Sequence, residues 1–446
     1  MNSSYININQ SVNSYKGVLP VYSRFQKLLE KVFLFSTTQK LYINFNKINK
    51  VYDFKDIGNV PVWVDSLYIS RMNCIENFYG IENLSGNRSI NLREVKFIRT
   101  KVNSFKGIEN LPECANTLEF ISCDIHTDAF SYTENEYISN KNVTVLKFHF
   151  EHDQKYKGLS FYGLKHVFPN LKELHITYGK NIDFNSFVDL PNTLDTLVLE
   201  HCIFDNKKDF INEDFIKRLP KNLKTLHLSF DFEKLNTIKK MGLKYLPPSL
   251  KELKLQTNVY MSPYFSLDGI DELPQSISFL SFHNMKLVYP FEKCELFPMS
   301  LVSLKLHIVR FKKDDGFRGI ERLPPRVHTL DLRHIDFEQE GLTNFTKSIF
   351  PINIQKFPDS IRRLDLSMNR RCIKSFKDLN FLPSRLEVLE LCLNGIKDFD
   401  GIENLPLDYL NYIGFNMNSI DYFKVDIPDV LTTNFKEKWT GVFERK

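Results

Sequence analysis

One frame of residues recurs along the whole chain, and it restricts the fold more than any other feature. The stretch from Leu382 to Ile396 shows the frame as Leu-Pro-x-x-Leu-x-x-Leu-x-Leu-x-x-Asn-x-Ile. Leu386 is its first core position. The leucines three and five residues later suit a short strand that points alternate side chains inward, and Asn394 then turns the chain. The frame therefore predicts a stack of similar strand-and-turn units.

Fifteen such units can be aligned by their first core position, with spacings from 23 to 34 residues. At 446 residues the default expectation is two or three globular domains, but a stack of units grows lengthwise as one long domain. The period is typical of repeats that contribute one strand each. The first core positions are Thr38, Val64, Leu92, Ala115, Val143, Leu171, Leu194, Leu223, Leu250, Ile277, Leu301, Val327, Ile361, Leu386 and Leu410.

The second half of each unit follows a second frame, Phe-x-Gly-Ile-Glu-Asn-Leu-Pro. Glycine after a short polar step fits a tight turn or a single helical turn on the outer side, and proline before the strand removes no bond from the sheet. The phenylalanines recur at one position per unit and are expected to stack in a column, which accounts for part of the 39 Phe residues. The clearest members of this column are Phe78, Phe105, Phe317 and Phe399.

The two ends of the chain depart from the frame. We predict an N-terminal helical cap over residues 1–37, the repeats over residues 38–420, and a C-terminal cap over residues 421–446. Apolar residues at helical spacing indicate a helix from Tyr22 to Phe35. Similar spacing from Val430 to Val442 indicates a closing helix.

On these residues the chain resembles leucine-rich repeat proteins, and Leu-Pro-Pro-Ser-Leu at 246–250 also resembles the FNIP-type subclass. The resemblance implies an α/β solenoid, a leucine-rich repeat horseshoe with a parallel β-sheet on the concave face and loops or short helices on the convex face. The turn position departs from the family pattern in the middle of the chain. Asn46, Asn258, Asn369, Asn394 and Asn418 fit, and Thr100, Cys123 and Cys202 are usual substitutes. No asparagine ladder is expected at Met72, Glu151, Gly179, Met285, Val309 and Ile335.

The inner face is the expected binding surface. The residue between the second and third core positions of each unit should project from it, because successive strand residues alternate between faces. The resulting row changes sign: lysines and histidines lie in its centre, and Asp331, Asp365 and Glu390 follow one another near its end. Adjacent carboxylates repel unless a partner neutralises them, so we hypothesise that this acidic strip receives a basic segment. The candidate partner-binding residues are Tyr42, Tyr68, Lys96, Lys147, His175, His227, Lys254, Lys305, Asp331, Arg333, Asp365 and Glu390.

Seven histidines also fall on this face, but their spacing does not bring three or four ligands together, so no metal or other cofactor is expected. Ordinary surface polarity and a pH-sensitive interface are the other interpretations. The histidines are His149, His175, His201, His227, His283, His307 and His334.

Several function classes find no support. No phosphate loop, Gly-x-Ser-x-Gly elbow, His-Glu-x-x-His motif or paired-cysteine motif is present. A net charge of +5 with interspersed signs does not favour nucleic acid, and no apolar run is long enough for a membrane span. Seven scattered cysteines and the lack of a signal peptide predict a cytoplasmic location, with the nucleus as an alternative.

The sequence thus predicts a non-enzymatic scaffold that binds an unidentified partner protein on its concave face. Two alternatives remain open. Leu19-Pro20 before a helix resembles the opening of an F-box, which some fungal relatives carry. The chain would then be a substrate-recognition subunit of an SCF-type ubiquitin ligase, with its N-terminal segment on the ligase adaptor. The other alternative is a regulatory subunit of an enzyme such as a phosphatase.

Overall fold

The structure is a computed structural model that divides into two compact units. Unit 1 comprises residues 1–210 and 218–223, and unit 2 comprises residues 211–217 and 224–446. The residues that the structure describes are 7–9, 40–44, 54, 60, 64–72, 74–85, 91–131, 139–151, 158–202, 213–230, 237–257, 264–288, 290–311, 317–337, 357–370, 373–420, 426–439 and 441–446.

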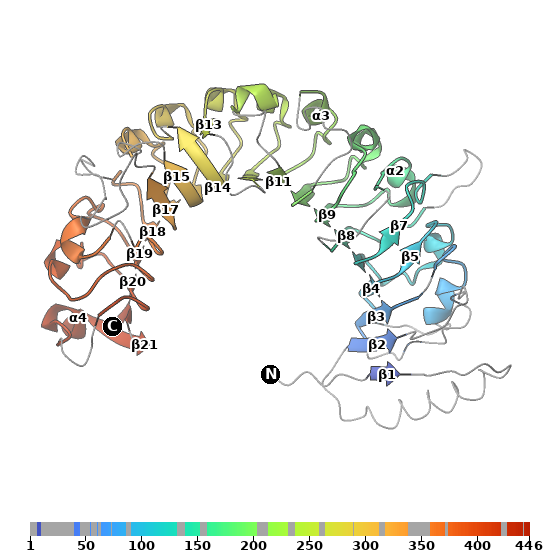
Figure 1. The fold of residues 1–446 in the computed structure, drawn as a ribbon, viewed down its shortest axis with the longest axis horizontal. Helices are drawn as coiled ribbons and strands as arrows, with labels where there is room; N and C mark the ends of the chain where they lie inside the picture. The colour runs from blue at the N-terminus through green and yellow to red at the C-terminus, as the bar shows by residue number, and fades with distance from the viewer. Residues whose placement is uncertain are drawn as a thin grey trace. The chain divides into compact units, whose positions relative to one another are not determined.

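Unit 1 is a parallel sheet whose strands pair in chain order (Figure 1). Short helices and turns lie on the outer side. The strands are β1 Asn7–Asn9, β2 Lys40–Asn44, β3 Ser66–Ser70, β4 Glu94–Ile98, β6 Thr117–Ile121, β8 Val145–His149, β9 Glu173–Thr177 and β10 Thr196–Glu200. A second, two-stranded sheet joins β5 Lys101–Val102 to β7 Asp124–Ile125. The helices are η3 Ile81–Leu84, η4 Ile108–Asn110, α2 Leu164–Val167 and η5 Phe184–Asp189.

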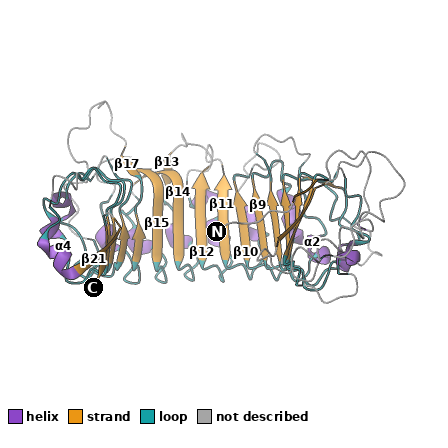
Figure 2. Ribbon diagram, turned by 90° about the horizontal axis from the view of Figure 1, so that it is seen from below, coloured by secondary structure: helices purple, strands orange, loops and turns teal. Residues whose placement is uncertain are grey.

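Unit 2 repeats the same plan, and Figure 2 shows its longer strands side by side. Its parallel strands are β11 Thr225–Phe230, β12 Glu252–Thr257, β13 Tyr264–Ser266, β14 Phe279–Val288, β15 Ser303–Phe311, β16 Thr329–Asp331, β17 Ile335–Phe337, β18 Arg363–Asp365, β19 Val388–Glu390 and β20 Tyr412–Gly414. The 3₁₀ helices between them are η6 Lys239–Met241, η7 Leu243–Tyr245, η8 Ile270–Glu272, η9 Cys294–Leu296, η10 Ile320–Arg322, η11 Phe376–Leu379 and η12 Ile402–Asn404. The α-helix α3, Glu213–Lys217, precedes them.

The core follows the predicted frame. A strand follows each of the fifteen first core positions, and all of these positions in the described part of the chain have no exposed surface: Val64, Leu92, Ala115, Val143, Leu171, Leu194, Leu223, Leu250, Ile277, Leu301, Val327, Ile361, Leu386 and Leu410. The proline before the strand accepts a hydrogen bond from this residue, as between Leu250 N and Pro247 O at 3.0 Å. Both units therefore have the α/β leucine-rich repeat fold.

The predicted phenylalanine column is present in both units and is buried. Burying aromatic rings of this size is worth more than a surface ion pair, at about 25 cal/mol per Å² of apolar area. In unit 1 four rings stack in chain order with centroid distances of 5.4, 5.5 and 4.4 Å: Phe54, Phe78, Phe105 and Phe130. In unit 2 the stacked pairs are Phe291 with Phe317, at 5.9 Å, and Phe376 with Phe399, at 6.2 Å.

The glycine of the second frame is required by the close stacking of turns. Gly107 has φ +89° just before η4, and an added Cβ would overlap the backbone of Tyr79 in the preceding turn. A left-handed conformation without room for a side chain admits only glycine at low cost.

Unit 2 contains two kinds of repeat: those with asparagine at the turn position, and those with an apolar residue there. Asn369 donates from Nδ2 to Leu332 O (2.9 Å) and Leu366 O (2.8 Å), and its Oδ1 accepts a bond from Ile335 N (2.7 Å). Asn394 and Asn418 make corresponding bonds, so the asparagine ladder runs through the last three repeats.

In unit 2, where the ladder is missing at Met285 and Val309, the strands continue. Met285 and Val309 are buried inside β14 and β15, and Ile335 starts β17, which pairs with the end of β15. Without an amide side chain to satisfy the turn, the backbone groups pair with the neighbouring strand instead. In unit 1 Cys123 and Cys202 donate weaker bonds from Sγ to Phe97 O (3.2 Å) and Ile176 O (3.5 Å), the carbonyls of the preceding repeat that an asparagine would reach.

The two ends differ in how much of them is described. At the N-terminus β1 pairs in parallel with β2, whereas the helix predicted over Tyr22 to Phe35 and the F-box resemblance lie outside the described residues. At the C-terminus the helical prediction is correct only for α4, Asp429–Asn434. From Phe435 onward it is wrong: β21 Phe435–Trp439 and β22 Val442–Arg445 form an antiparallel hairpin, and β22 pairs with β20. The open edge of β20 offers backbone groups that a helix could not satisfy.

Candidate partner-binding face

The sheet face is the side of each sheet that carries the residue between the second and third core positions. In unit 1 the strand register places one such residue from each repeat side by side, in the order Tyr42, Tyr68, Lys96, Glu119, Lys147, His175 and Val198. In unit 2 the register gives a second row, in the order His227, Lys254, Ser281, Lys305, Asp331, Asp365, Glu390 and Gly414.

The first two residues of the unit 1 row, Tyr42 and Tyr68, form an aromatic stack. The rings of Tyr42 and Tyr68 lie 4.2 Å apart between centroids, and the ammonium group of Lys96 lies 5.3 Å from the Tyr68 centroid. Amphipathic rings beside a cation are common in protein interfaces.

Lys96 and Glu119 form the centre of an ion network in unit 1. Lys96 Nζ lies 2.5 Å from Glu119 and 3.0 Å from Glu94, and His149 Nε2 lies 3.2 Å from the other Glu119 oxygen. Burial alone would raise the pKa of Glu119, but its bonds to His149 and Lys96 outweigh burial and lower the pKa to about 2. Burial likewise opposes the charge of Lys96, and Glu119 and Glu94 nevertheless raise the pKa of that lysine. Both groups are therefore charged at neutral pH.

Two histidines of the sheet face, His175 and His307, have a lowered pKa. Burial lowers the pKa of His175, although Glu173, at 3.2 Å, opposes this shift. Burial and the nearby charge of Arg333 lower the pKa of His307. His227 lies 2.8 Å from Glu252. The lysines of the rows include Lys305, whose ammonium group lies 5.1 Å from the ring centroid of Phe279.

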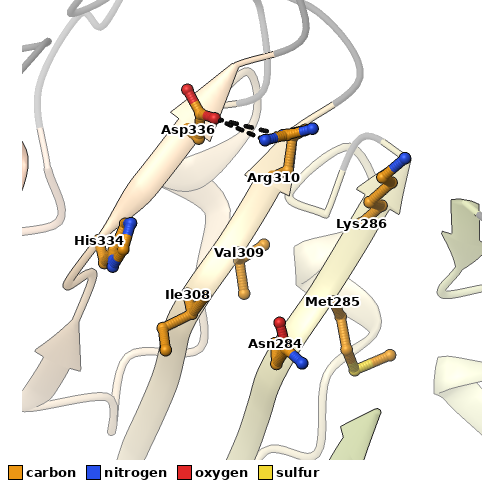
Figure 3. A pocket seen from close by; sticks show the side chains of 8 residues that line it. All are labelled: Asn284, Met285, Lys286, Ile308, Val309, Arg310, His334 and Asp336. Carbon is orange, nitrogen blue, oxygen red and sulfur yellow. Dashed lines mark hydrogen bonds and ion pairs between the residues drawn. The ribbon is translucent and has the colours of Figure 1, made fainter. Parts of the chain in front are cut away.

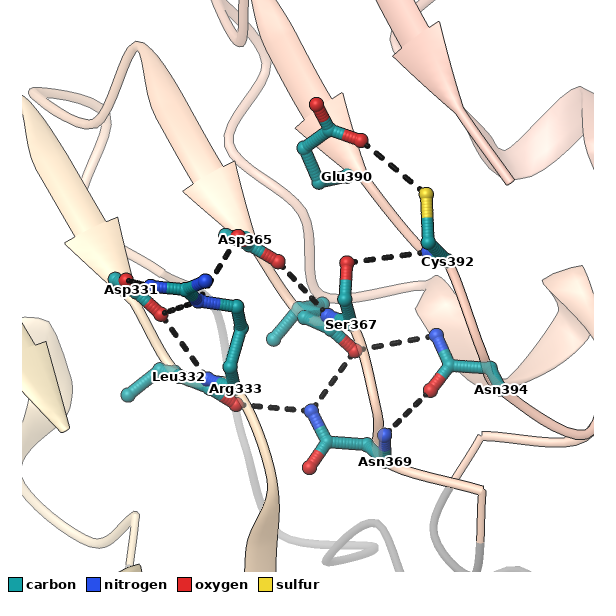
Figure 4. A network of polar contacts seen from close by, with 10 residues as sticks. Asp331, Leu332, Arg333, Asp365, Ser367, Asn369, Glu390, Cys392 and Asn394 are labelled. Carbon is teal, nitrogen blue, oxygen red and sulfur yellow. Dashed lines mark hydrogen bonds and ion pairs between the residues drawn. The ribbon is translucent and has the colours of Figure 1, made fainter. Parts of the chain in front are cut away.

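The acidic strip of unit 2 is partly neutralised within the chain (Figure 4). Arg333 donates to Asp331 from Nε (2.9 Å) and Nη2 (2.7 Å), and its Nε lies 3.2 Å from Asp365. Asp331 and Asp365 also accept bonds from the backbone nitrogens of Arg333 and Ser367, two residues further on. The idea that these carboxylates repel until a partner arrives is therefore wrong for Asp331, whose side chain is only 7% exposed.

Asp365 and Glu390 are closer to the predicted arrangement of adjacent carboxylates that repel one another. They face one another across β18 and β19, and burial, with a contribution from neighbouring carboxylates, raises the pKa of both. Glu390 accepts a weak bond from Cys392 Sγ at 3.5 Å. The Glu390 carboxylate lies against Gly414, so a Cβ added at Gly414 would overlap its oxygen. An approaching cation would relieve the repulsion between these two groups.

A further row includes His201 and His334, which the sequence placed on this face, but its backbone conformation was not predicted. The residue just before the turn position has positive φ in most described repeats: Arg71, Arg99, Ser122, Tyr178, His201, Asn284, Ile308, His334, Met368, Leu393 and Met417. Backbone bonds join neighbours, as from Met368 N to Cys392 O (2.8 Å) and from Leu393 N to Asn416 O (3.2 Å). The recurring position before each asparagine was a usable signal, but large apolar residues in a left-handed conformation are not predicted by propensity.

In the described part of the chain no three His, Cys, Asp or Glu side chains gather as metal ligands. Burial raises the pKa of the Cys202 and Cys392 thiols to about 12, so both are protonated.

A shallow pocket lies where β14, β15 and β17 continue past the turn position, and its ion pair joins Arg310 to Asp336 at 3.0 Å (Figure 3).

The sequence matches no protein-family model and no curated protein. A solved structure to which the chain is similar is the leucine-rich repeat-containing protein LegL7 from Legionella pneumophila. The identity is 16% and the TM-score 0.33, and the match covers 59% of this chain and 89% of that chain. Within the residues that the structure describes, no helix has the length and apolar character needed to cross a bilayer.

Proposed function

We propose that the protein is a non-enzymatic scaffold that binds another protein on its sheet face. The observation that carries the proposal is the register, which lines up a polar, charged or aromatic side chain from every repeat of the two rows except those of Val198 and Gly414. With strands ~4.8 Å apart, each row extends over about 30 Å, a length suited to an interface of standard size. The Leu-Pro-Pro-Ser-Leu form at 246–250 supports placing the chain in the FNIP-type subclass.

The rows favour recognition of an extended surface over binding of a small molecule. Tyr42, Tyr68 and Lys96 combine aromatic area with charge in unit 1, and unit 2 passes from lysines to carboxylates along one row. Charges held by fixed neighbours give specificity without large reorganisation on binding.

Affinity capture tests the proposal. The chain is used as bait in a lysate of the cells from which the sequence comes, and captured proteins are identified by mass spectrometry. Lys147→Glu in unit 1 and Lys305→Glu in unit 2 place a reversed charge on the sheet face. We expect at least one captured protein to be lost, or reduced tenfold, with one of these variants.

The matched controls are Lys141→Glu and Lys397→Glu, which make the same charge change at exposed positions outside the strands. They should retain the protein that the face variants lose. If all four variants capture the same set as the wild type, the sheet face is not the binding surface.

A further inference from the structure

The last three repeats of unit 2 carry exposed or half-buried apolar side chains in a backbone conformation that favours glycine and asparagine. Met368, Leu393 and Met417 have φ of 63°, 57° and 57°. Met368 is 40% exposed and Met417 70% exposed. We call these three residues the apolar ridge. Large side chains are strained at such φ values, and exposure of apolar surface brings no compensating burial within the chain.

The apolar ridge runs parallel to the carboxylates of the sheet face. Each ridge residue follows a residue of the row by three positions: Met368 follows Asp365, Leu393 follows Glu390, and Met417 follows Gly414. The backbone ladder between Met368, Leu393 and their neighbours keeps the ridge in line with β18, β19 and β20. Met368 and Leu393 therefore lie beside the two carboxylates, whereas Met417 lies beside Gly414.

The two carboxylates beside the apolar ridge have few cations near them among the described residues. Arg333 lies close to Asp365 but is held by two bonds to Asp331, and the charge that acts on Glu390 is that of the exposed Arg363. Asp365 and Glu390 therefore have fewer cationic partners than carboxylates in the same position elsewhere, such as Glu119, which contacts both Lys96 and His149.

We propose that this surface binds a basic amphipathic helix of another protein. The proposal rests on the scaffold function above and names the chemistry of the segment. An α-helix rises about 5.4 Å per turn, close to the ~4.8 Å between strands, so a helix lying across the strands presents one residue per turn to each repeat. Its apolar stripe covers the apolar ridge, and its Lys or Arg residues reach Asp365 and Glu390.

A model peptide tests the proposal on the full chain. The probe is a fluorescein-labelled 14-residue peptide of leucine and lysine with the leucines on one helical face, and the comparison peptide has glutamate for lysine. Fluorescence anisotropy gives Kd for each. We expect the lysine peptide to bind at least tenfold more tightly.

The protein variants separate the two halves of the surface. Met368→Asn with Met417→Asn removes apolar area and keeps the fold, because asparagine tolerates positive φ; it should weaken the lysine peptide about tenfold. Glu390→Gln should weaken it about threefold. Met299→Asn, at a 55% exposed methionine before β15, should leave Kd unchanged.

Two results would overturn the inference: equal affinity for the lysine and glutamate peptides, or wild-type affinity in the double asparagine variant. Affinity capture distinguishes this failure from failure of the scaffold proposal. If the lysine-to-glutamate face variants lose a partner and the double asparagine variant binds the lysine peptide as the wild type does, the scaffold stands and the ridge does not.

Discussion

The side chains of the sheet face find their first electrostatic partners within the chain. Lys96 lies between two glutamates in unit 1, and Arg333 between two aspartates in unit 2. An exposed ion pair contributes little to stability, but Glu119 and Asp331 have side chains only 10% and 7% exposed. Removing one member of such a pair leaves the other buried without its counter-charge.

Glu119 should make unit 1 sensitive to acid. Its pKa is about 2 in the folded chain against 4.5 ordinarily, so its contribution is complete above pH 4.5 and is lost as the pH falls toward 2. We expect about 1–2 kcal/mol of the free energy of unfolding to depend on it. Urea unfolding between pH 2 and 7 should show a smaller acid dependence in Glu119→Gln. The exposed Glu113→Gln is the control, and an identical pH dependence in both variants would contradict the assignment.

At the scale of the element, strand length in unit 2 differs with the residue at the turn position. Asn369 and Asn394 close their turns with side-chain hydrogen bonds, and the strands before them have three residues. Met285 and Val309 close no turn, and β14 and β15 have 10 and 9 residues. In unit 2 the long strands therefore accompany apolar turn residues, and the shallow pocket lies along the later part of these strands.

The asparagine ladder should be worth more than its cysteine substitutes. Asn394→Ala removes donors to Leu366 O (3.1 Å) and Leu391 O (2.9 Å) and the acceptor of Asn369 N, all in a buried site, so we expect a loss of about 3 kcal/mol. Cys202→Ala removes only long bonds from a weak donor and should cost about 1 kcal/mol. Urea unfolding measures both, and amide exchange at Asn369 should accelerate only in the first variant. Equal losses would mean that the amide adds nothing over the thiol.

At the scale of the whole molecule, repetition leaves an open sheet edge that needs cover. In unit 2, β22 pairs antiparallel with β20, and Phe443 stacks on Phe415 at 5.3 Å between centroids. A stack of repeats requires such an end to stay soluble, since an exposed edge strand pairs with other chains.

Deletion of residues 426–446 should therefore cause aggregation and lower the thermal unfolding midpoint. The deletion exposes the edge of β20 and the buried ring of Phe415. Light scattering at increasing protein concentration detects the aggregation, and deletion of Lys446 alone is the control because it keeps the hairpin. A monomeric deletion variant with the wild-type midpoint would show that the hairpin does not protect this edge.

The spacing of leucines determined the repeat class, the buried positions, the phenylalanine column and the row of each sheet face. These features follow from local periodicity: side chains alternate along a strand, and equivalent positions of equivalent repeats become neighbours. At the C-terminus the same kind of argument gave a wrong prediction. The spacing from Val430 onward suits a helix, but the open edge of β20 pairs with the antiparallel strand β22 instead.

The tertiary structure alone decided which charges are paired and which remain for a partner. Arg333 reaches Asp365 on the next strand of the sheet, across 32 residues of chain, and no local pattern encodes that contact. The same holds for the left-handed residues of the apolar ridge, because cross-strand hydrogen bonds and the packing of the turn impose a φ that methionine and leucine do not prefer. Sequence periodicity determines where side chains lie along the sheet, whereas contacts between distant residues determine their charge balance and their backbone strain.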